Sequence, residues 1–210
     1  MKTITELKVQ VKNKKRVSVY LDGAYFCGLD LQVALSNRLK VGAQIDEKTL
    51  VRIQMESEKQ TAFDKALKFI ERSVKTERAV RQKLATYGYL NEVIDVVIEK
   101  LKGYSFLSDK NYAERYVSTY SKNKGKRLIR AELKQKGVSD ADMESALMVV
   151  ESELESAVNL AKKYAKNKQN DQKNYSKCYK YLLSKGFTYE DRLTATKQAF
   201  NTEEIELNLI

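Results

Sequence analysis

Residues 5–29 alternate between apolar and polar positions with a period of two, which is typical of half-buried β-strands. A loop at Asn13–Lys15 divides this stretch and sets Val11 opposite Val17. Because side chains on a strand alternate between its two faces, one face of the resulting sheet is apolar. Six residues of the first two strands belong to that face: Leu7, Val9, Val11, Val17, Val19 and Leu21.

The dipeptide Asp22-Gly23 predicts a tight hairpin turn, because a type I′ turn requires positive φ at both of its central positions. Pairing across this turn places Leu21 beside Ala24 and Val19 beside Phe26, on the same apolar face. The stretch therefore predicts a small three-stranded antiparallel meander. A sheet of that size needs a cover to be stable.

Two helices are expected to follow the strands. Asp30 and Asp46 each precede a helical pattern, and a carboxylate there can cap the first free amides of a helix. Gly42 marks a break between the two helices. The stretch 47–72 contains no glycine or proline, so one long helix is predicted to join the strand module to the rest of the chain. The first helix carries the apolar residues Leu31, Ala34, Leu35 and Leu39.

The rest of the chain repeats itself with a period of 49 residues. Three segments align without a gap: residues 79–89, 128–138 and 177–187. Their apolar pairs, four positions apart, are Val80 and Leu84, Ile129 and Leu133, and Cys178 and Leu182. Each pair is followed four positions later by a glycine, at Gly88, Gly137 and Gly186. Because glycine adopts the left-handed conformation without a steric penalty, each segment predicts a helix with its stop.

A further helix repeats after each of these stops. Its apolar stripe has the i, i+3, i+4, i+7 spacing of an amphipathic helix. The stripes are Ile94, Val97, Ile98 and Leu101 in the first unit, and Met143, Ala146, Leu147 and Val150 in the second. In the last unit the match is loose, with Leu193 and Phe200 about one position out of phase. The opening helices are marked by Phe63 and Leu67 and by Tyr112 and Tyr116.

These patterns predict a mainly α-helical protein. Its core is a tandem array of three three-helix repeats, each similar to a helix-turn-helix unit, preceded by a small antiparallel β meander with a helix. Each repeat is too apolar to stand alone, so neighbours are expected to stack into an elongated, curved array. The expected boundaries are 1–50 for the N-terminal module, 51–103 and 104–153 for the first two repeats, and 154–210 for the third repeat with its tail.

Composition narrows the cellular setting. Hydrophobic residues make up 42% of the 210 residues, and no apolar run approaches the ~20 residues of a membrane-spanning helix. The N-terminus also lacks the apolar segment of a signal peptide, so a cytoplasmic location is expected and no membrane partner. Cys27 and Cys178 show no metal-binding spacing, and free thiols in a reducing compartment are the preferred interpretation over a disulfide.

Candidate catalytic chemistry is sparse. The chain contains no histidine, the commonest general base and metal ligand, so most hydrolase and metalloenzyme schemes are excluded. There is no phosphate-binding loop or nucleotide fingerprint. Acidic pairs at Asp140/Asp142 and Glu203/Glu204 are interpreted as helix-start and tail residues, because no third ligand is apparent for an ion. We expect no enzymatic activity, no catalytic residues, no cofactor and no metal.

A formal net charge of +11 favours an anionic partner, either nucleic acid or an acidic protein surface. The densest basic run spans 122–136, where Glu132 is the only acid. A flexible loop around Gly125 is expected to enter a helix whose free N-terminal amides add to this positive potential. Arg127 and Arg130 can share one helical face, although an ordinary solvated face is the alternative. The candidate residues are Lys122, Lys124, Lys126, Arg127, Arg130, Lys134 and Lys136.

The other two repeats supply further basic candidates, Arg78, Arg81, Lys177, Lys180 and Lys185. A second basic stretch spans 162–185, and its polar middle, 166–174, predicts a long loop that could equally touch DNA or not. Tyrosines at repeat positions are better explained by packing than by base stacking: Tyr112, Tyr116, Tyr164 and Tyr181. Single-strand stacking platforms usually present aromatic residues on a sheet beside a basic groove, and that pattern is not evident here.

Two motifs in the second repeat resemble those of the RecX family, the regulators of the RecA recombinase. They are SFLSDKNYAERYV at 105–117 and GKRLIRAELKQKGVSD at 125–140, and KALKFIERSVKTERAVRQKL at 65–84 resembles the opening repeat of that family. The likeness spans about 62–200. The strand module lies outside it, and Tyr179 stands where the first two repeats have Arg81 and Arg130.

The resemblance implies a cytoplasmic protein that lies along the RecA–DNA filament, bridges subunits in its groove and restrains ATP hydrolysis and strand exchange. It implies a regulatory role in DNA repair, recombination and the SOS response, without chemistry of its own. We expect a monomer whose partner is the RecA nucleoprotein filament. The alternative is a sequence-nonspecific protein that binds single- or double-stranded DNA directly through its basic helical faces. An adaptor with an unknown partner is the third hypothesis.

Overall fold

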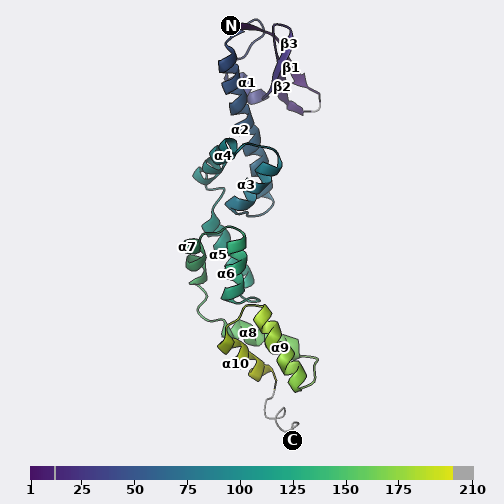
Figure 1. Cartoon of the computed structure of the whole chain (residues 1–210), viewed down its shortest axis with the longest axis vertical. Helices are drawn as coiled ribbons and strands as arrows, with labels where there is room; N and C mark the ends of the chain where they lie inside the picture. Colours follow the sequence, from purple (N-terminus) through teal and green to yellow (C-terminus); the bar gives the residue numbers. More distant parts are fainter. Residues whose placement is uncertain (12, 201–210) are drawn as a thin grey trace. The chain divides into compact units, whose positions relative to one another are not determined.

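The computed structural model describes residues 1–11 and 13–200, and it is mainly helical (Figure 1). The acidic pair Glu203/Glu204 and the expected C-terminal tail lie outside the described residues. The chain divides into two compact units, Met1–Leu107 and a second that begins at Ser108. The first unit holds the strand module and one three-helix repeat, and the second holds the other two repeats. The predicted fold class is confirmed.

The strand module forms one antiparallel sheet of order β3-β2-β1-β4 in the described residues. Its strands are β1 (Lys2–Gln10), β2 (Asn13–Leu21), β3 (Ala24–Asp30) and β4 (Gln44–Ile45). Asp22 and Gly23 form the turn after β2 with φ of 47° and 85°, as the hairpin prediction required. The meander of the first three strands is confirmed, whereas β4 was not predicted, because a two-residue strand leaves no periodicity in a sequence.

The register differs from the prediction at two places. Val17 pairs with Val9 rather than Val11, because β2 already begins at Asn13 and the expected loop is part of the strand. A shift of two residues keeps the same face buried, so Val17 still lies in the core. Leu21 pairs with Ala24 as predicted. Val19, however, faces Cys27 rather than Phe26.

The second difference arises from an irregularity in the β2–β3 ladder. The register shifts between Val19 and Tyr20, so that Tyr20 pairs with Tyr25 although Val19 pairs with Cys27. Phe26 is therefore the extra residue of a β-bulge, and it packs partly buried against the same core as Cys27. A bulge has no signature in a simple alternation of apolar and polar residues, which is why the prediction was wrong here.

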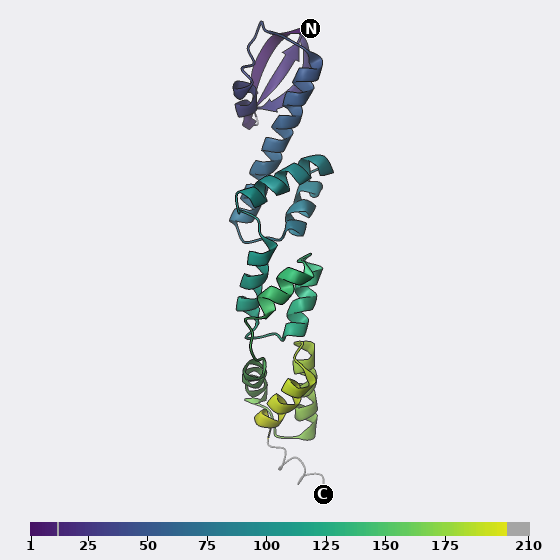
Figure 2. The ribbon, with the colours of Figure 1, turned by 90° about the vertical axis from the view of Figure 1, so that its left-hand side faces the viewer.

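Two helices cover one face of the sheet (Figure 1). They are α1 (Leu31–Ser36) and α2 (Glu47–Glu71). Asp30 caps α1 by accepting hydrogen bonds from the amides of Gln32 (2.9 Å) and Val33 (3.4 Å), and Asp46 caps α2, so both predicted caps are confirmed. Leu35 is exposed, because the core of this short helix is built by Val33 and Ala34 instead. As predicted, α2 runs unbroken from the sheet into the first repeat (Figure 2).

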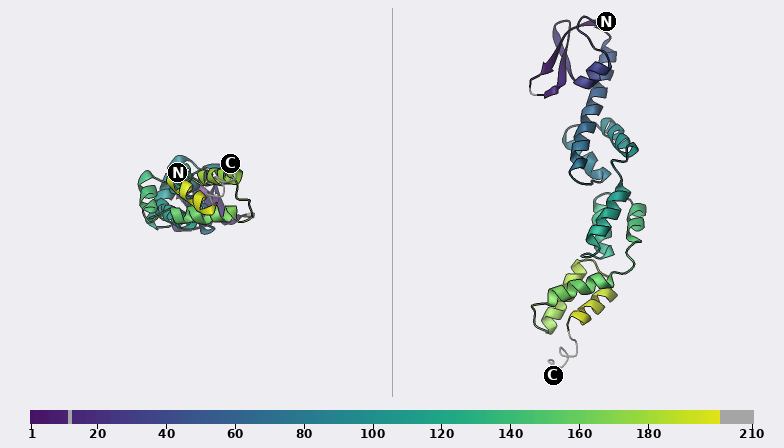
Figure 3. Two further views of the ribbon diagram at one scale, coloured as in Figure 1. Left: turned by 90° about the horizontal axis from the view of Figure 1, so that it is seen from below. Right: turned by 180° about the vertical axis from the view of Figure 1, so that it is seen from behind.

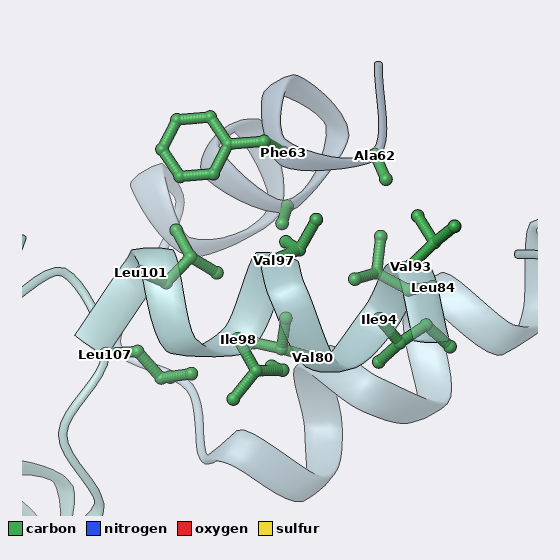
Figure 4. Close-up of a cluster of buried hydrophobic side chains, with 11 residues drawn as sticks. Ala62, Phe63, Val80, Leu84, Val93, Ile94, Val97, Ile98, Leu101 and Leu107 are labelled. Atoms are coloured by element: carbon green, nitrogen blue, oxygen red, sulfur yellow. The ribbon is translucent and has the colours of Figure 1, made fainter. Parts of the chain in front are cut away.

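Each repeat consists of three helices around its own hydrophobic cluster. The first combines the end of α2 with α3 (Glu77–Thr86) and α4 (Asn91–Gly103). The second comprises α5 (Asp109–Tyr120), α6 (Lys126–Gln135) and α7 (Asp140–Leu147). The third comprises α8 (Leu154–Ala165), α9 (Gln172–Ser184) and α10 (Tyr189–Ala199). Figure 4 shows the first cluster, where Ile98 and Leu101 of α4 are fully buried.

The middle helix of every repeat ends in the same way. The three glycines have φ of 83°, 87° and 84°, which is the left-handed region. In the second repeat the amide of Gly137 donates to Lys134 O (3.0 Å) and that of Val138 donates to Leu133 O (3.1 Å). This is the Schellman arrangement, and the same two bonds recur after α3 and α9. The predicted helix stops are confirmed.

The third helix of the last repeat keeps the period that the sequence obscured. Its buried residues include Arg192, Ala195 and Thr196, which lie 49 positions after Met143, Ala146 and Leu147. The expectation of a phase shift at Leu193 was wrong, because two buried positions are polar and therefore invisible to a search for apolar stripes. Thr196 is satisfied there by donating from Oγ1 to Arg192 O (2.7 Å). In the second repeat α7 ends at Leu147, so Val150 lies beyond the helix.

The polar stretch predicted as a long loop is shorter than expected. Asp171 caps α9 by accepting a hydrogen bond from Asn174 N (2.6 Å), so residues 172–174 already belong to the helix. Both cysteines are buried free thiols, and burial raises the pKa of Cys27 to about 11. Within residues 1–11 and 13–200, no helix is both long and apolar enough to cross a membrane. Over the same residues no cluster of three or more acidic or cysteine side chains could hold a metal ion.

Candidate partner-binding surface

Two of the predicted site arginines form ion pairs inside their own repeats. Arg81 Nη1 on α3 lies 2.5 Å from Asp95 Oδ1 on α4, and Arg81 Nε lies 2.6 Å from Glu77 Oε1. On α6, Arg130 forms two parallel hydrogen bonds to Glu144 of α7, with distances of 2.8 and 3.0 Å. Asp95 and Glu144 are again 49 positions apart, so one ion pair joins the second and third helices in both repeats.

Electrostatics around these pairs agree with their geometry. The hydrogen bond to Glu144 raises the pKa of Arg130, and Arg130 in turn lowers the pKa of the Glu144 carboxyl. Burial by itself would raise the pKa of Glu77, but hydrogen bonds from Lys102 and Arg81 outweigh it and the pKa is lowered. Both arginines therefore have a carboxylate partner within the repeat before any other molecule arrives.

The third repeat replaces this ion pair with an aromatic arrangement. Tyr179 occupies the position of the arginine and Leu193 that of the acid. Arg192 is only 8% exposed, its guanidinium lies 4.8 Å from the centre of the Tyr179 ring, and its Nε donates to Thr188 O (3.1 Å). In the third repeat the positive charge therefore lies on the third helix, whereas in the first two repeats it lies on the second helix, and here it is largely buried. The predicted basic face is interrupted at this point.

The amides of Gly125 and Lys126 at the N-terminus of α6 have hydrogen-bond partners within the chain, contrary to the expectation of free amides in a flexible loop. Gly125 is buried, and its amide donates to Lys185 O (2.9 Å) at the end of α9. The amide of Lys126 donates to the carboxylate of Glu153, which comes from the linker before α8. A carboxylate of the chain itself therefore occupies the place predicted for an external phosphate or carboxylate.

Two glycines explain why this junction closes so tightly. A Cβ on Gly125 would lie 2.4 Å from Gly186 O, and one on Gly186 would lie 2.5 Å from the amide nitrogen of Leu128. The backbones of the second and third repeats are therefore in direct contact, which only residues without a side chain allow. Gly186 also forms the helix stop of α9, so one residue serves both purposes.

Lys124 is likewise held inside the second repeat. Its Nζ lies 2.7 Å from both carboxylate oxygens of Glu132 and 4.4 Å from the centre of the Tyr120 ring. Tyr116 donates its hydroxyl hydrogen to the same carboxylate (2.7 Å). Burial, followed by this hydrogen bond, raises the pKa of Tyr116. Lys124 thus stabilises the contact between α5 and α6.

Lysine side chains lie over aromatic rings in every repeat, although not at equivalent repeat positions. In the first repeat Lys65 and Lys83 lie 4.7 and 4.9 Å from the centre of the Tyr87 ring. In the third, the corresponding distances are 4.3 Å from Lys168 to Tyr164 and 5.4 Å from Lys185 to Tyr181. This recurrence was not predicted from the sequence. Its signal was a spacing of four residues between an aromatic residue and a lysine, at Lys83/Tyr87, Tyr120/Lys124, Tyr164/Lys168 and Tyr181/Lys185.

Most of the remaining candidates are exposed. Arg127 and Lys134 lie on the side of α6 opposite the buried Ile129 and Leu133, together with Arg130. Arg78 occupies the position of Arg127 on α3. The other exposed candidates are Lys122, Lys136, Lys177 and Lys180, whereas Lys126 and Lys185 are half-buried. Lys177 and Lys180 fall 49 positions after Leu128 and Ala131, so they do not continue the face of Arg127.

Four family models match the chain in order. The model described as the regulatory protein RecX N-terminal domain matches residues 2–46. Those of the first, second and third three-helix domains of RecX match residues 62–101, 108–147 and 151–191. The likeness therefore includes the strand module, which the sequence motifs had left outside it.

Individual proteins agree with these family models. A Clostridium tetani protein named regulatory protein RecX is 38% identical over 194 residues, which cover 90% of both chains. A Clostridium botulinum protein of the same name is 37% identical over 97% of this chain and 99% of its own length. A crystal structure described as regulatory protein RecX has a TM-score of 0.72 at 28% identity, and the match covers 94% of this chain and 100% of the solved one.

Proposed function

The chain belongs to the RecX family of regulatory proteins, and from this membership we propose that it modulates the RecA recombinase. It binds as a monomer along or within the groove of the RecA–DNA filament, in the cytoplasm, and restrains ATP hydrolysis and strand exchange. The observation that carries the proposal is the match to all four domains of one regulatory family over most of the chain.

The ion pairs within the repeats support a choice among the basic side chains proposed to contact the filament. Arg81, Arg130 and Lys124 already have carboxylate partners, so they position helices rather than supply free charge. Arg127 and Lys134 are exposed and have no ion pair among the described residues. We therefore assign the filament contact to the face of α6 that carries Arg127 and Lys134. Complementary acidic patches on RecA subunits would attract this face.

The test is a titration of the full chain into RecA that hydrolyses ATP on single-stranded DNA. If the protein docks on the filament, ATPase inhibition should appear with far less protein than is needed to coat the DNA. An ATPase rate that stays unchanged until the DNA itself is covered would reject filament docking.

A direct nucleic-acid function through the basic helical faces is the competing proposal, favoured by the net charge of +11. It predicts affinity for bare duplex DNA that falls linearly in a log–log plot against salt, with a slope of ~0.9 per phosphate contact. Affinity measured without RecA across a salt series separates the two functions. Filament docking predicts that duplex affinity is weak at the salt concentrations where ATPase inhibition persists.

A further inference from the structure

The sheet of the N-terminal module has one face that no described element of its unit covers. Helices α1 and α2 lie on the opposite side (Figures 1 and 3). We call the uncovered side the open sheet face. A residue is assigned to this face when its neighbours along the strand are buried or when its cross-strand partner points outward. The residues assigned in this way include Lys8, Gln10, Arg16, Ser18, Tyr20, Tyr25 and Gly28.

The β-bulge at Phe26 places an aromatic pair on this face. In an unbroken ladder Tyr25 would point in the same direction as the buried Cys27. The extra residue turns Tyr25 outward beside Tyr20, and the two rings meet edge to face with centroids 5.7 Å apart and an angle of 75°. Tyr25 remains 60% exposed, so the face of its ring is available for another flat group.

Polar groups converge next to this pair, above Gly28. An added Cβ there would lie 3.0 Å from Gln10 Nε2, 3.4 Å from Arg16 Nη2 and 3.6 Å from the Tyr25 hydroxyl. Arg16 is fixed by donating from Nη2 to Gly28 O (2.8 Å), and Gln10 donates to Ser18 Oγ (3.2 Å). These bonds hold a guanidinium, an amide and a phenol together on a flat surface, with other donors still unused.

The charge of the open sheet face is positive at the end nearest the β1–β2 hairpin. Lys8 and Arg16 lie there, and the exposed Lys14, two positions before Arg16 in β2, shares the side of Arg16. Glu6 is the one exposed acid among the outward strand residues described, because Asp30 is buried as the cap of α1. Lys15 and Arg16 also line a hollow against α2 that contains Asp64 and Glu71, and its mixed charge excludes this hollow from the site.

We propose that the open sheet face binds single-stranded DNA. An unpaired base stacks on Tyr25, and Arg16, Lys8 and Lys14 hold the adjacent phosphates. Exposed aromatic rings on a sheet beside basic side chains are the arrangement of single-strand-binding platforms, because every base offers a π-face and every nucleotide a charge. This pattern is not visible in the sequence, since only the bulge brings Tyr25 to the outer face. The site lies outside the helical repeats and does not require RecA.

The chain contains no tryptophan, so Tyr25→Trp introduces a single indole at the stacking position. Its fluorescence is measured while an oligothymidylate is added to the full chain without RecA. Tyr189→Trp is the matched control, because Tyr189 in the third repeat is similarly exposed, at 63%. We expect saturable quenching in Tyr25→Trp, much weaker quenching by a duplex of equal length, and little change in Tyr189→Trp.

A second pair of variants separates stacking from other effects. Tyr25→Ala should weaken binding of a labelled oligothymidylate by about tenfold, whereas Tyr25→Phe, which keeps the ring, should bind nearly as the wild type does. Lys8→Ala should reduce the salt slope by about 0.7, the value for one phosphate contact of a single strand. Unchanged far-ultraviolet circular dichroism confirms folding, since both side chains are exposed.

Two outcomes would overturn this site. One is oligothymidylate binding that is unaffected by Tyr25→Ala and leaves the Tyr25→Trp indole unquenched, which would place DNA elsewhere on the chain. The other is an indole signal that responds to RecA alone and not to DNA, which would make the open sheet face a protein-binding surface. Neither outcome depends on whether the chain inhibits the RecA ATPase, so this proposal and the regulatory function fail separately.

Discussion

At the scale of single residues, the contact between Lys124 and Glu132 is a well-enclosed ion pair, with side-chain exposures of 20% and 27%. Burial by itself would raise the pKa of Glu132, but hydrogen bonds from Lys124 and Tyr116 outweigh it and the pKa is lowered. A carboxyl whose folded pKa lies below its unfolded value stabilises the fold above the unfolded pKa. That contribution is lost as the pH falls through the folded pKa.

Glu132→Gln should therefore destabilise the protein at pH 7 by about 1 kcal/mol, a value discounted for partial exposure. The difference between variant and wild type should shrink as the pH is lowered from 7 toward 3, because the wild-type carboxyl becomes protonated. Urea unfolding of both proteins at several pH values measures this difference. A constant difference across the series would show that the charge of Glu132 contributes nothing.

Another residue-scale prediction concerns the glycine contact between the second and third repeats. Gly125→Ala would force a Cβ against the backbone of Gly186, at 2.4 Å, and neither backbone can move freely. We expect a loss of about 2 kcal/mol and a melting temperature lowered by roughly 5 °C. Gly103→Ala is the control, because an added Cβ there meets nothing within 4 Å and φ is not positive. Equal melting temperatures for the two variants would contradict the close contact.

At the scale of helices and strands, the recurring ion pair between the middle and last helix is a structural feature of the first two repeats. A double-mutant cycle with Arg130→Ala and Glu144→Ala should give only a small favourable coupling, because both side chains are largely exposed. If Arg130 acts only inside the repeat, Glu144→Ala should affect RecA inhibition no less than Arg130→Ala. Loss of inhibition in Arg130→Ala alone would instead identify Arg130 as a filament contact.

The elements differ in how far their sequence determines them. Turns and helix ends that need positive φ are readable, which is why Gly23 and the three repeat glycines were identified correctly. The register of β2 and β3 could not be read fully from the sequence. The bulge at Phe26 depends on which side chains fill the space beneath α1 and α2. Periodicity also failed at Arg192 and Thr196, where hydrogen bonds and a ring contact allow polar residues to be buried.

The candidate site shows the same division between features that the sequence reveals and features that depend on tertiary packing. The sequence located the basic run of the second repeat, but it could not tell a paired charge from a free one. Whether Arg130 meets Glu144, or Lys126 N–H meets Glu153, depends on how helices and linkers distant in sequence are brought together. The open sheet face was missed for a similar reason, since Tyr25 faces outward only in the bulged register.

At the scale of the whole molecule, the chain combines a sheet module with three repeats whose cores are separate clusters. The proposals assign different tasks to different parts. In these proposals the exposed face of α6 contacts the filament, and the sheet module binds single-stranded DNA. A variant in one part should therefore leave the activity of the other intact, and Tyr25→Ala should retain most of the ATPase inhibition caused by α6.

The central claim is that the face of α6 carrying Arg127 and Lys134 acts on RecA. The most direct measurement compares the wild type with the double variant Arg127→Glu/Lys134→Glu in the ATPase titration on single-stranded DNA. The control is Lys162→Glu/Lys163→Glu, which makes the same charge change at exposed positions of α8. The account predicts that wild type and control inhibit at substoichiometric amounts, and that the α6 variant needs at least about tenfold more protein, or 1.4 kcal/mol. Equal inhibition by all three proteins would contradict it.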